Sequence, residues 1–163
     1  FVRTSELICA RWPEFDLKAS RWDIPAERMK MKTPHTVALS TQAKAIVDRL
    51  KAISLDRDYV FPGDLNPHKP MSNNTLLFAL YRLGYRGRMT GHGFRGVAST
   101  LLHEQGWPHE HIEIQLAHQE RDEVSSAYNH ALYLEPRARM IRGGLRPIDR
   151  HRQKGRAPGG GRV

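Results

Sequence analysis

Histidine and arginine stand three residues apart in the segment Thr90-Gly91-His92-Gly93-Phe94-Arg95, where an apolar helical pattern begins. Residues three apart are neighbours on a helix surface. The N-terminus of a helix also directs unpaired N–H groups and positive potential at whatever lies before it. A phosphate would therefore meet an imidazole, a guanidinium and backbone donors together. The other interpretation is a surface His/Arg pair beside a turn, and these residues alone do not exclude it.

Residues 91–96 also match the dinucleotide-binding pattern GxGxxG. That pattern indicates a dinucleotide site only where an apolar strand precedes it inside a βαβ unit. Here Arg86-Gly87-Arg88-Met89-Thr90 stands before it, which is not an apolar strand. We therefore expect no nicotinamide or flavin cofactor.

Three histidines lie close together in the sequence: His103, His109 and His111. Gly106 and Pro108 interrupt this group, and it shows no ligand pattern such as HExxH. We expect solvated or capping histidines here in preference to a metal site. The single cysteine, Cys9, excludes an internal disulfide framework and a zinc site built from cysteines. No metal or other cofactor is expected.

The elements that must position these side chains are mostly helical. Helix starts are expected at the capping residues Thr4, Ser40 and Ser72, and helix ends at Gly84 and Gly106. The helix after His92 is expected to bury one apolar face, made of Phe94, Val97, Ala98, Leu101 and Leu102. Pro108 suits the first turn of the next helix. A last helix begins near Glu123 and carries Tyr128 beside an apolar stripe.

Short β-compatible pieces interrupt the helices between residues 14 and 39. Trp22–Ile24 and Thr36–Leu39 are expected to form two strands of a small hairpin sheet, with Met29–Lys32 near its turn. The sequence therefore predicts a mostly α domain with a small antiparallel β-sheet, which is an α+β fold.

The formal net charge of the 163 residues is +9. Residues 137–163 contain nine Lys/Arg and one acid, so the remaining 17 basic and 16 acidic residues leave residues 1–136 nearly neutral. No acid stands between Asp64 and Glu104, a stretch that contains Lys69, Arg82, Arg86, Arg88 and Arg95. A local positive face there could receive an anion, although ordinary surface variation explains the charge pattern equally well.

Five segments together resemble the catalytic domain of tyrosine recombinases of the prophage integrase kind. His92-Gly93-Phe94-Arg95 resembles the family's HxxR box, and Val2-Arg3-Thr4-Ser5-Glu6-Leu7 resembles its first-arginine box. Met29-Lys30-Met31 is similar to the lysine segment of the family's hairpin. Leu116-Ala117-His118 matches the Leu-Gly/Ala-His box, and Tyr128-Asn129 follows ten residues after the histidine. Each box alone is weak, whereas five in order over residues 1–136 are hard to obtain by chance.

The resemblance implies that the protein cuts and rejoins DNA without metal, through a 3′-phosphotyrosine on Tyr128. Arg3 and Arg95 would clamp the non-bridging phosphate oxygens, a task that suits planar guanidinium groups. Taken singly, Tyr128 could instead be a core aromatic and Arg3 a surface residue at a helix start.

The resemblance also implies how protons move. His92 would assist proton transfer at the tyrosine, and His118 would hydrogen-bond the phosphate, although a histidine there could also cap a helix. Lys30 would be the general acid for the 5′-oxygen. We prefer it to Lys32 by its offset from Ala38, the family's usual proline position. Further contacts with DNA are expected from Lys32, Arg86 and Arg88.

Residues 1–142 are expected to form the catalytic domain, and residues 143–163 a disordered basic tail rich in Gly, Pro and Arg. The chain does not begin with Met and opens beside the first-arginine box, so we expect an N-terminally truncated piece. The full-length protein is expected to act as a homotetramer on double-stranded DNA attachment sites, and this piece to be a monomer.

The leading functional prediction is integration or excision of a prophage or other mobile element, in the bacterial cytoplasm and at the nucleoid. A type IB topoisomerase is an alternative with the same chemistry. A non-catalytic DNA-binding remnant of a decayed integrase and a small helical scaffold without nucleic acid are alternatives from other classes. No stretch is long or apolar enough to cross a membrane.

Overall fold

Helices form most of the regular structure of the chain. The computed structural model describes residues 1–30, 32–54, 57–117 and 133–143. Its elements, in chain order, are α1 (Thr4–Ile8), η1 (Trp12–Glu14), β1 (Phe15–Asp16), β2 (Arg21–Ile24), η2 (Ala26–Arg28), β3 (His35–Ala38), α2 (Thr41–Ala52), α3 (Asn73–Arg82), α4 (Gly93–Glu104), α5 (His109–Gln115) and α7 (Leu134–Arg142). The predicted α+β class is confirmed.

The three strands form one antiparallel sheet in the order β1-β2-β3. Trp22 and Ile24 on β2 are buried, while Arg21 and Asp23 between them are partly exposed. This alternation is the period of a strand with one buried face. Both predicted strands are confirmed, although each starts one residue earlier than expected and β3 ends at Ala38 and not at Leu39. β1 was not predicted, because two residues are too few to show a period.

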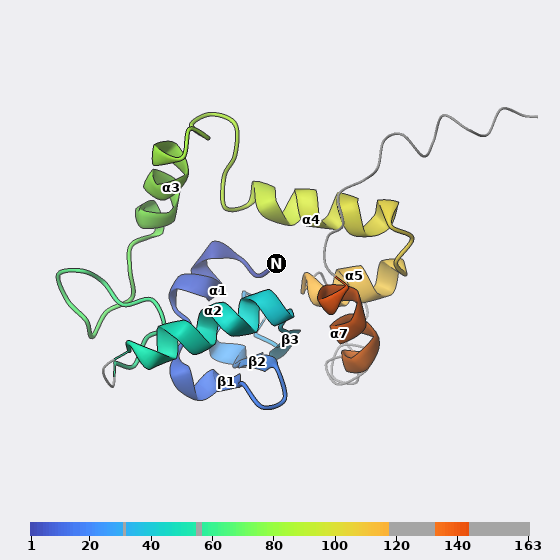
Figure 1. Cartoon of the computed structure of the whole chain (residues 1–163), viewed down its shortest axis with the longest axis horizontal. Helices are drawn as coiled ribbons and strands as arrows, with labels where there is room; N and C mark the ends of the chain where they lie inside the picture. Colours follow the sequence, from blue (N-terminus) through green and yellow to red (C-terminus); the bar gives the residue numbers. More distant parts are fainter. Residues whose placement is uncertain (31, 55–56, 118–132, 144–163) are drawn as a thin grey trace, which may run out of the picture.

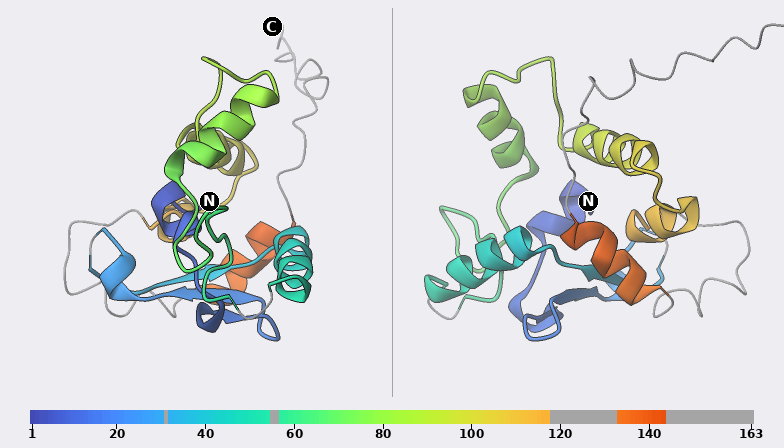
Figure 2. Two further views of the ribbon diagram at one scale, coloured as in Figure 1. Left: turned by 90° about the vertical axis from the view of Figure 1, so that its left-hand side faces the viewer. Right: turned by 45° about the vertical axis from the view of Figure 1, so that its right-hand side comes forward.

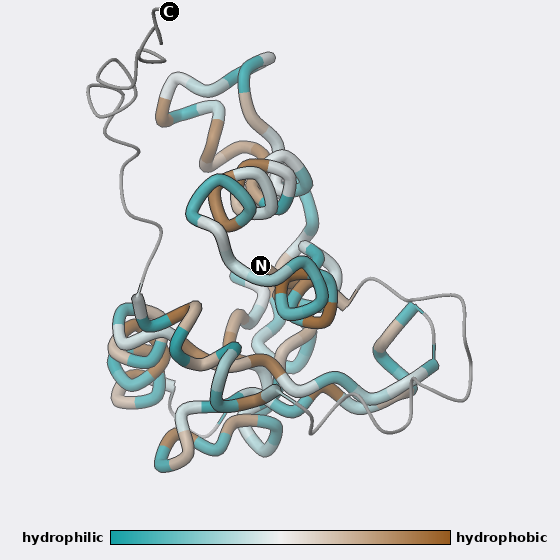
Figure 3. Tube along the Cα trace, turned by 90° about the vertical axis from the view of Figure 1, so that its right-hand side faces the viewer, coloured by the Kyte–Doolittle hydropathy of each residue, from teal (hydrophilic) through white to brown (hydrophobic). Residues whose placement is uncertain are grey.

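The buried apolar residues form two clusters. The sheet core consists of Ala10, Trp22, Ile24, Met29, Val37, Leu39 and Val60. The helical core consists of Leu102, Ile112, Leu116 and Met140, from α4, from α5 and its C-cap, and from α7. Figure 1 shows the sheet below the N-terminus and α4, α5 and α7 mostly to its right, with α7 beside β3. The helices are amphipathic, with hydrophobic and hydrophilic residues on different sides (Figure 3).

Two chain segments connect the sheet core with the helical core. Phe1 packs against the helical core, while Val2 packs against the sheet core. In the same way, Leu116 belongs to the helical core and Ala117 packs against the sheet core. Side chains that meet these two segments therefore lie at the junction of the cores.

Most of the predicted helix ends are confirmed. Ser40 Oγ accepts from the backbone N of Ala43 at 3.1 Å, and Ser72 Oγ accepts from Asn74 at 3.2 Å. Gly84 and Gly106 follow their helices with φ of +83° and +78°, a conformation that costs glycine little. The expected cap at Thr4 is wrong by one residue. Arg3 is the N-cap of α1.

The expected buried face of α4 is wrong in part. Phe94 and Val97 are 50% and 44% exposed, whereas Arg95 is 5% exposed and lies beside buried Ala98 and Leu102. The cause is that α4 is covered along residues 95, 98 and 102, where α5 packs, and not along the neighbouring stripe. The right-hand view of Figure 2 shows α3 apart from α4, α5 and α7, and no residue of α3 is buried.

The predicted helix from Glu123 lies outside the described residues, and so does the predicted tail beyond Gly143. The sequence pattern predicted one last helix from near Glu123 and did not predict α7 as a separate helix. Within the described ranges, no helix combines the length and apolar character that a membrane crossing requires.

Candidate active site

The guanidinium of Arg95 lies at the junction of the two cores. Nη1 donates to the carbonyl oxygen of Phe1, and Nη2 donates to that of Leu116 at 2.5 Å. Because these carbonyls belong to the two connecting segments, one side chain links α4 to both of them. The first turn of α4 therefore presents a guanidinium whose position is fixed by two acceptors.

The charge of Arg95 is not neutralised by a direct carboxylate contact among the described residues. Burial lowers the pKa of Arg95, and the positive charge of Arg3 lowers it further, while Glu6 and Glu113 act in the opposite direction. The two arginines that the sequence assigned to phosphate are thus close enough to repel each other. An anion held between them would relieve both the repulsion and the cost of burial.

Glu6 holds Arg3 at the start of α1. Its Oε1 accepts from Nη1 of Arg3 at 2.7 Å, and its Oε2 accepts from the backbone N of Arg3, also at 2.7 Å. Glu6 is buried, and the side chain of Arg3 is 27% exposed. The carboxylate therefore orients the guanidinium while leaving part of it accessible.

The loop before α4 packs directly against α1. A Cβ atom at Gly91 would lie 2.5 Å from Oγ1 of Thr4, a distance that only glycine tolerates without movement. Thr90 Oγ1 accepts from the backbone N of Gly93 at 3.1 Å and so completes the turn. His92 between them is the N-cap of α4, and its side chain is exposed. The residues before Gly91 form a turn, not the strand that a dinucleotide site needs.

Lys30 lies on the connection between β2 and β3, which projects from the sheet in Figure 2. Its neighbour Met29 is buried in the sheet core, whereas Lys30 is exposed. Nζ of Lys32 donates to the backbone carbonyl of Glu27 at 3.3 Å. The contacts of the described residues do not bring Lys30 together with Arg3 or Arg95.

His118 and Tyr128, the two remaining predicted catalytic residues, lie outside the described residues. The structure does describe the residue pair that leads to His118. The carbonyl of Leu116 is held by Arg95, and Ala117 has a φ of +50°. The chain therefore turns sharply directly after α5 and immediately before the predicted histidine.

Arg86 and Arg88 are exposed on the turn between α3 and α4. The guanidinium of Arg86 lies 5.5 Å from the centroid of the Tyr81 ring. Both residues are exposed to solvent. Their contacts with DNA stay a prediction.

The histidines near Gly106 contact each other. Nε2 of His103 is 3.0 Å from Nδ1 of His109, and Nδ1 of His103 is 2.8 Å from the carbonyl oxygen of Ser99. The His111 ring lies 4.9 Å from the Tyr133 ring. In the described part of the chain, no three His, Cys, Asp or Glu side chains are grouped to hold a metal ion.

Two arginines in buried polar contacts were not singled out from the sequence. Arg28 contacts Glu14, and Arg137 contacts Gln115. Each pair joins residues at least 14 positions apart, so neither has a local spacing that would reveal it.

The sequence of this chain is similar to known proteins of one family. The phage integrase family model matches residues 1–135. The prophage integrase IntA of Escherichia coli (strain K12) is 46% identical over 140 residues, 86% of this chain and 34% of the relative. The integrase of Enterobacteria phage P4 is 43% identical over 170 aligned positions, 94% of this chain and 39% of the relative. The chain spans less than half the length of either relative. No solved structure matches it significantly.

Proposed function

The chain belongs to the phage integrase family, and on that basis we propose that the protein cleaves and rejoins DNA at specific sites, to integrate or excise a prophage or other mobile element. The observation that carries this proposal is the position of Arg95. Its guanidinium is buried, bound to two backbone carbonyls and close to a second arginine, Arg3. Two guanidinium groups near each other favour a phosphodiester as ligand.

In the proposed reaction, the phenolic oxygen of Tyr128 attacks the scissile phosphorus. A bond from phosphorus to the tyrosine oxygen forms while the bond from phosphorus to the 5′-oxygen breaks. Negative charge develops on the non-bridging oxygens, where Arg3 and Arg95 stabilise it. A pre-positioned donor loses no free energy to reorganisation during the reaction, which is why the fixing of Arg95 by Phe1 and Leu116 supports this role.

The proton of the tyrosine and the proton of the leaving group need separate carriers. His92, exposed at the N-cap of α4, would take up the phenolic proton, and His118 would donate a hydrogen bond to the phosphate. Lys30 would protonate the 5′-oxygen. The contact of Lys32 with the backbone of Glu27 supports the choice of Lys30 over its neighbour. Reversal of the same steps rejoins the strand, so neither ATP nor a metal ion is required.

The proposed partner is double-stranded DNA at attachment sites, bound by a homotetramer of the full-length protein in the bacterial cytoplasm. Lys32, Arg86 and Arg88 would add contacts with the DNA backbone. Such contacts make binding weaker as the salt concentration rises.

The test uses the full-length protein and nicked DNA substrates that trap the covalent intermediate. Wild type should give a protein–DNA adduct that survives denaturant and does not require divalent metal. Tyr128→Phe should abolish it, and Arg95→Ala should lower its rate about 10²–10³-fold. The matched control is Arg139→Ala, which removes an exposed arginine on α7 and should react like wild type.

Two results would decide against the proposal. A folded wild type that binds the substrate but never forms the adduct indicates a DNA-binding protein without catalysis. Relaxation of supercoiled plasmid without an attachment site, at the rate seen with one, indicates a topoisomerase.

A further inference from the structure

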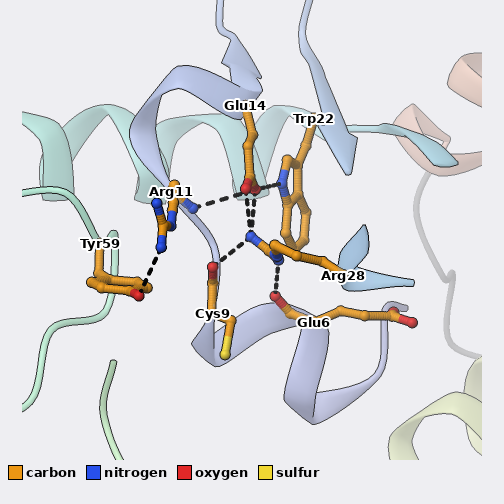
Figure 4. A network of polar contacts seen from close by, with 7 residues as sticks. All are labelled: Glu6, Cys9, Arg11, Glu14, Trp22, Arg28 and Tyr59. Atoms are coloured by element: carbon orange, nitrogen blue, oxygen red, sulfur yellow. Dashed lines mark hydrogen bonds and ion pairs between the residues drawn. The ribbon is translucent and has the colours of Figure 1, made fainter. Parts of the chain in front are cut away.

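Arg28 at the end of η2 and Glu14 at the end of η1 form a largely buried ion pair (Figure 4). Nη1 of Arg28 is 2.5 and 2.7 Å from the two carboxylate oxygens of Glu14, and the side chains are 17% and 10% exposed. Glu14 Oε2 also accepts from Nε1 of Trp22 at 2.9 Å. The carboxylate is thereby fixed to β2, and it fixes the guanidinium in turn.

The other contacts of Arg28 are with α1. Nη1 donates to the backbone carbonyl of Cys9 at 2.5 Å, and Nη2 donates to that of Glu6 at 2.7 Å. Carbonyls in the last turn of a helix have no partner inside the helix, and they attract positive charge. Arg28 therefore caps the C-terminal end of the helix whose N-terminal end is Arg3.

Glu6 brings the two arginines into one chain of contacts. Its carboxylate holds Arg3, while its backbone carbonyl accepts from Arg28. Lys30 follows Arg28 by only two residues, and Met29 between them is buried. The base of the connection that carries Lys30 is thus bound to the helix that carries Arg3, and not only to its own strands.

We propose that Arg28 is a positioning residue, which sets where Lys30 lies relative to the phosphate held by Arg3. This rests on the proposed function, because it assumes that Lys30 protonates the leaving 5′-oxygen. Arg28 itself touches neither the substrate nor the reacting atoms. Its loss should therefore impair the protonation step while leaving attack by Tyr128 and phosphate binding largely intact.

Two substrates separate these steps. In ordinary DNA the leaving group is an alkoxide, which needs a proton during bond breaking. When sulfur replaces the bridging 5′-oxygen, the leaving group is a thiolate, which is stable without one because thiols are far more acidic than alcohols. A defect in the proton donor slows cleavage of the oxygen substrate only. A defect in the arginines or in folding slows both.

The experiment measures single-turnover cleavage of both substrates by the full-length protein. Lys30→Ala provides the reference for complete loss of the proton donor. Arg28→Gln should slow the oxygen substrate about 10–100-fold, part of the effect usual for general acids, and change the sulfur substrate less than about 3-fold. The control is Arg21→Gln on β2, which removes an arginine paired with Asp16 and Asp23 outside the α1 contacts and should leave both rates unchanged.

Arg28→Gln leaves the carboxylate of Glu14 buried without its cation, which endangers folding. The double variant Glu14→Gln/Arg28→Gln removes both charges and should show the same loss on the oxygen substrate only. Equal slowing of both substrates by this folded variant, or no slowing of either, would overturn the role of Arg28. Wild type that cleaves neither substrate would instead refute the proposed function.

Discussion

Nε of Arg137 on α7 donates to Oε1 of Gln115 on α5 at 3.0 Å, and both side chains are completely buried. Nη2 of the same guanidinium donates to the backbone carbonyl of Thr36 on β3. Burial lowers the pKa of Arg137 to about 10, so it stays charged at neutral pH. Arg137 thus ties α7 to the sheet and to α5, the helix that leads to His118.

Arg137→Ala should lower the free energy of unfolding by about 2–4 kcal/mol. The substitution leaves a cavity, and it leaves the carbonyl of Thr36 and Oε1 of Gln115 without the guanidinium that donates to them. Arg139→Ala, on the exposed side of α7, should change it by less than about 0.5 kcal/mol. Urea unfolding measures both. Equal, small losses would mean that the contacts of Arg137 contribute nothing net.

Arg95→Lys keeps the positive charge but cannot donate to Phe1 and Leu116 with the geometry of a guanidinium. Adduct formation should therefore fall about 10²–10³-fold while DNA binding at low salt changes little. Trapping assays and a binding titration on the same substrate measure the two quantities. A lysine variant that cleaves at the wild-type rate would show that charge alone suffices.

Gly91→Ala places a Cβ against Oγ1 of Thr4 and should cost about 1–3 kcal/mol of stability. Adding Thr4→Ala should recover most of this loss, because the Cβ of residue 4 would then lie at an ordinary 3.7 Å. Gly96→Ala is the control. Nothing lies near its added Cβ, so the variant should gain about 0.5–1 kcal/mol from helix propensity. Thermal unfolding of all four variants tests the contact, and additivity of Gly91→Ala and Thr4→Ala would disprove it.

Shortening a side chain should affect stability differently on the buried and the exposed face of α4. Leu102→Ala should cost about 2–5 kcal/mol, because Leu102 is 1% exposed in the helical core. Val97→Ala should cost less than about 1 kcal/mol, because Val97 is 44% exposed. Denaturant unfolding distinguishes them. A large loss at Val97 in the full-length protein, but not in this chain, would show that a further segment covers that side of α4.

The sequence by itself determined most of the helices, two of the three strands and the order of the candidate site residues. Ser40 and Ser72 cap helices, and Gly84 and Gly106 end them, because these effects act within one turn of the chain. The alternation around Trp22 predicted a strand for the same reason. The motif containing His92 and Arg95 was likewise readable, because both residues stand in one helical turn.

Only the tertiary structure decided what those elements touch. Arg95 is buried because its acceptors, one of them 94 residues away, come together where the sheet core and the helical core meet. Helical periodicity gave α4 an apolar face but could not tell which stripe would be covered, and Phe94 lies outside it. The pairing of Arg28 with Glu14 depends on packing between elements. Such contacts have no fixed spacing, because the free energy that selects them comes from burial of the whole chain.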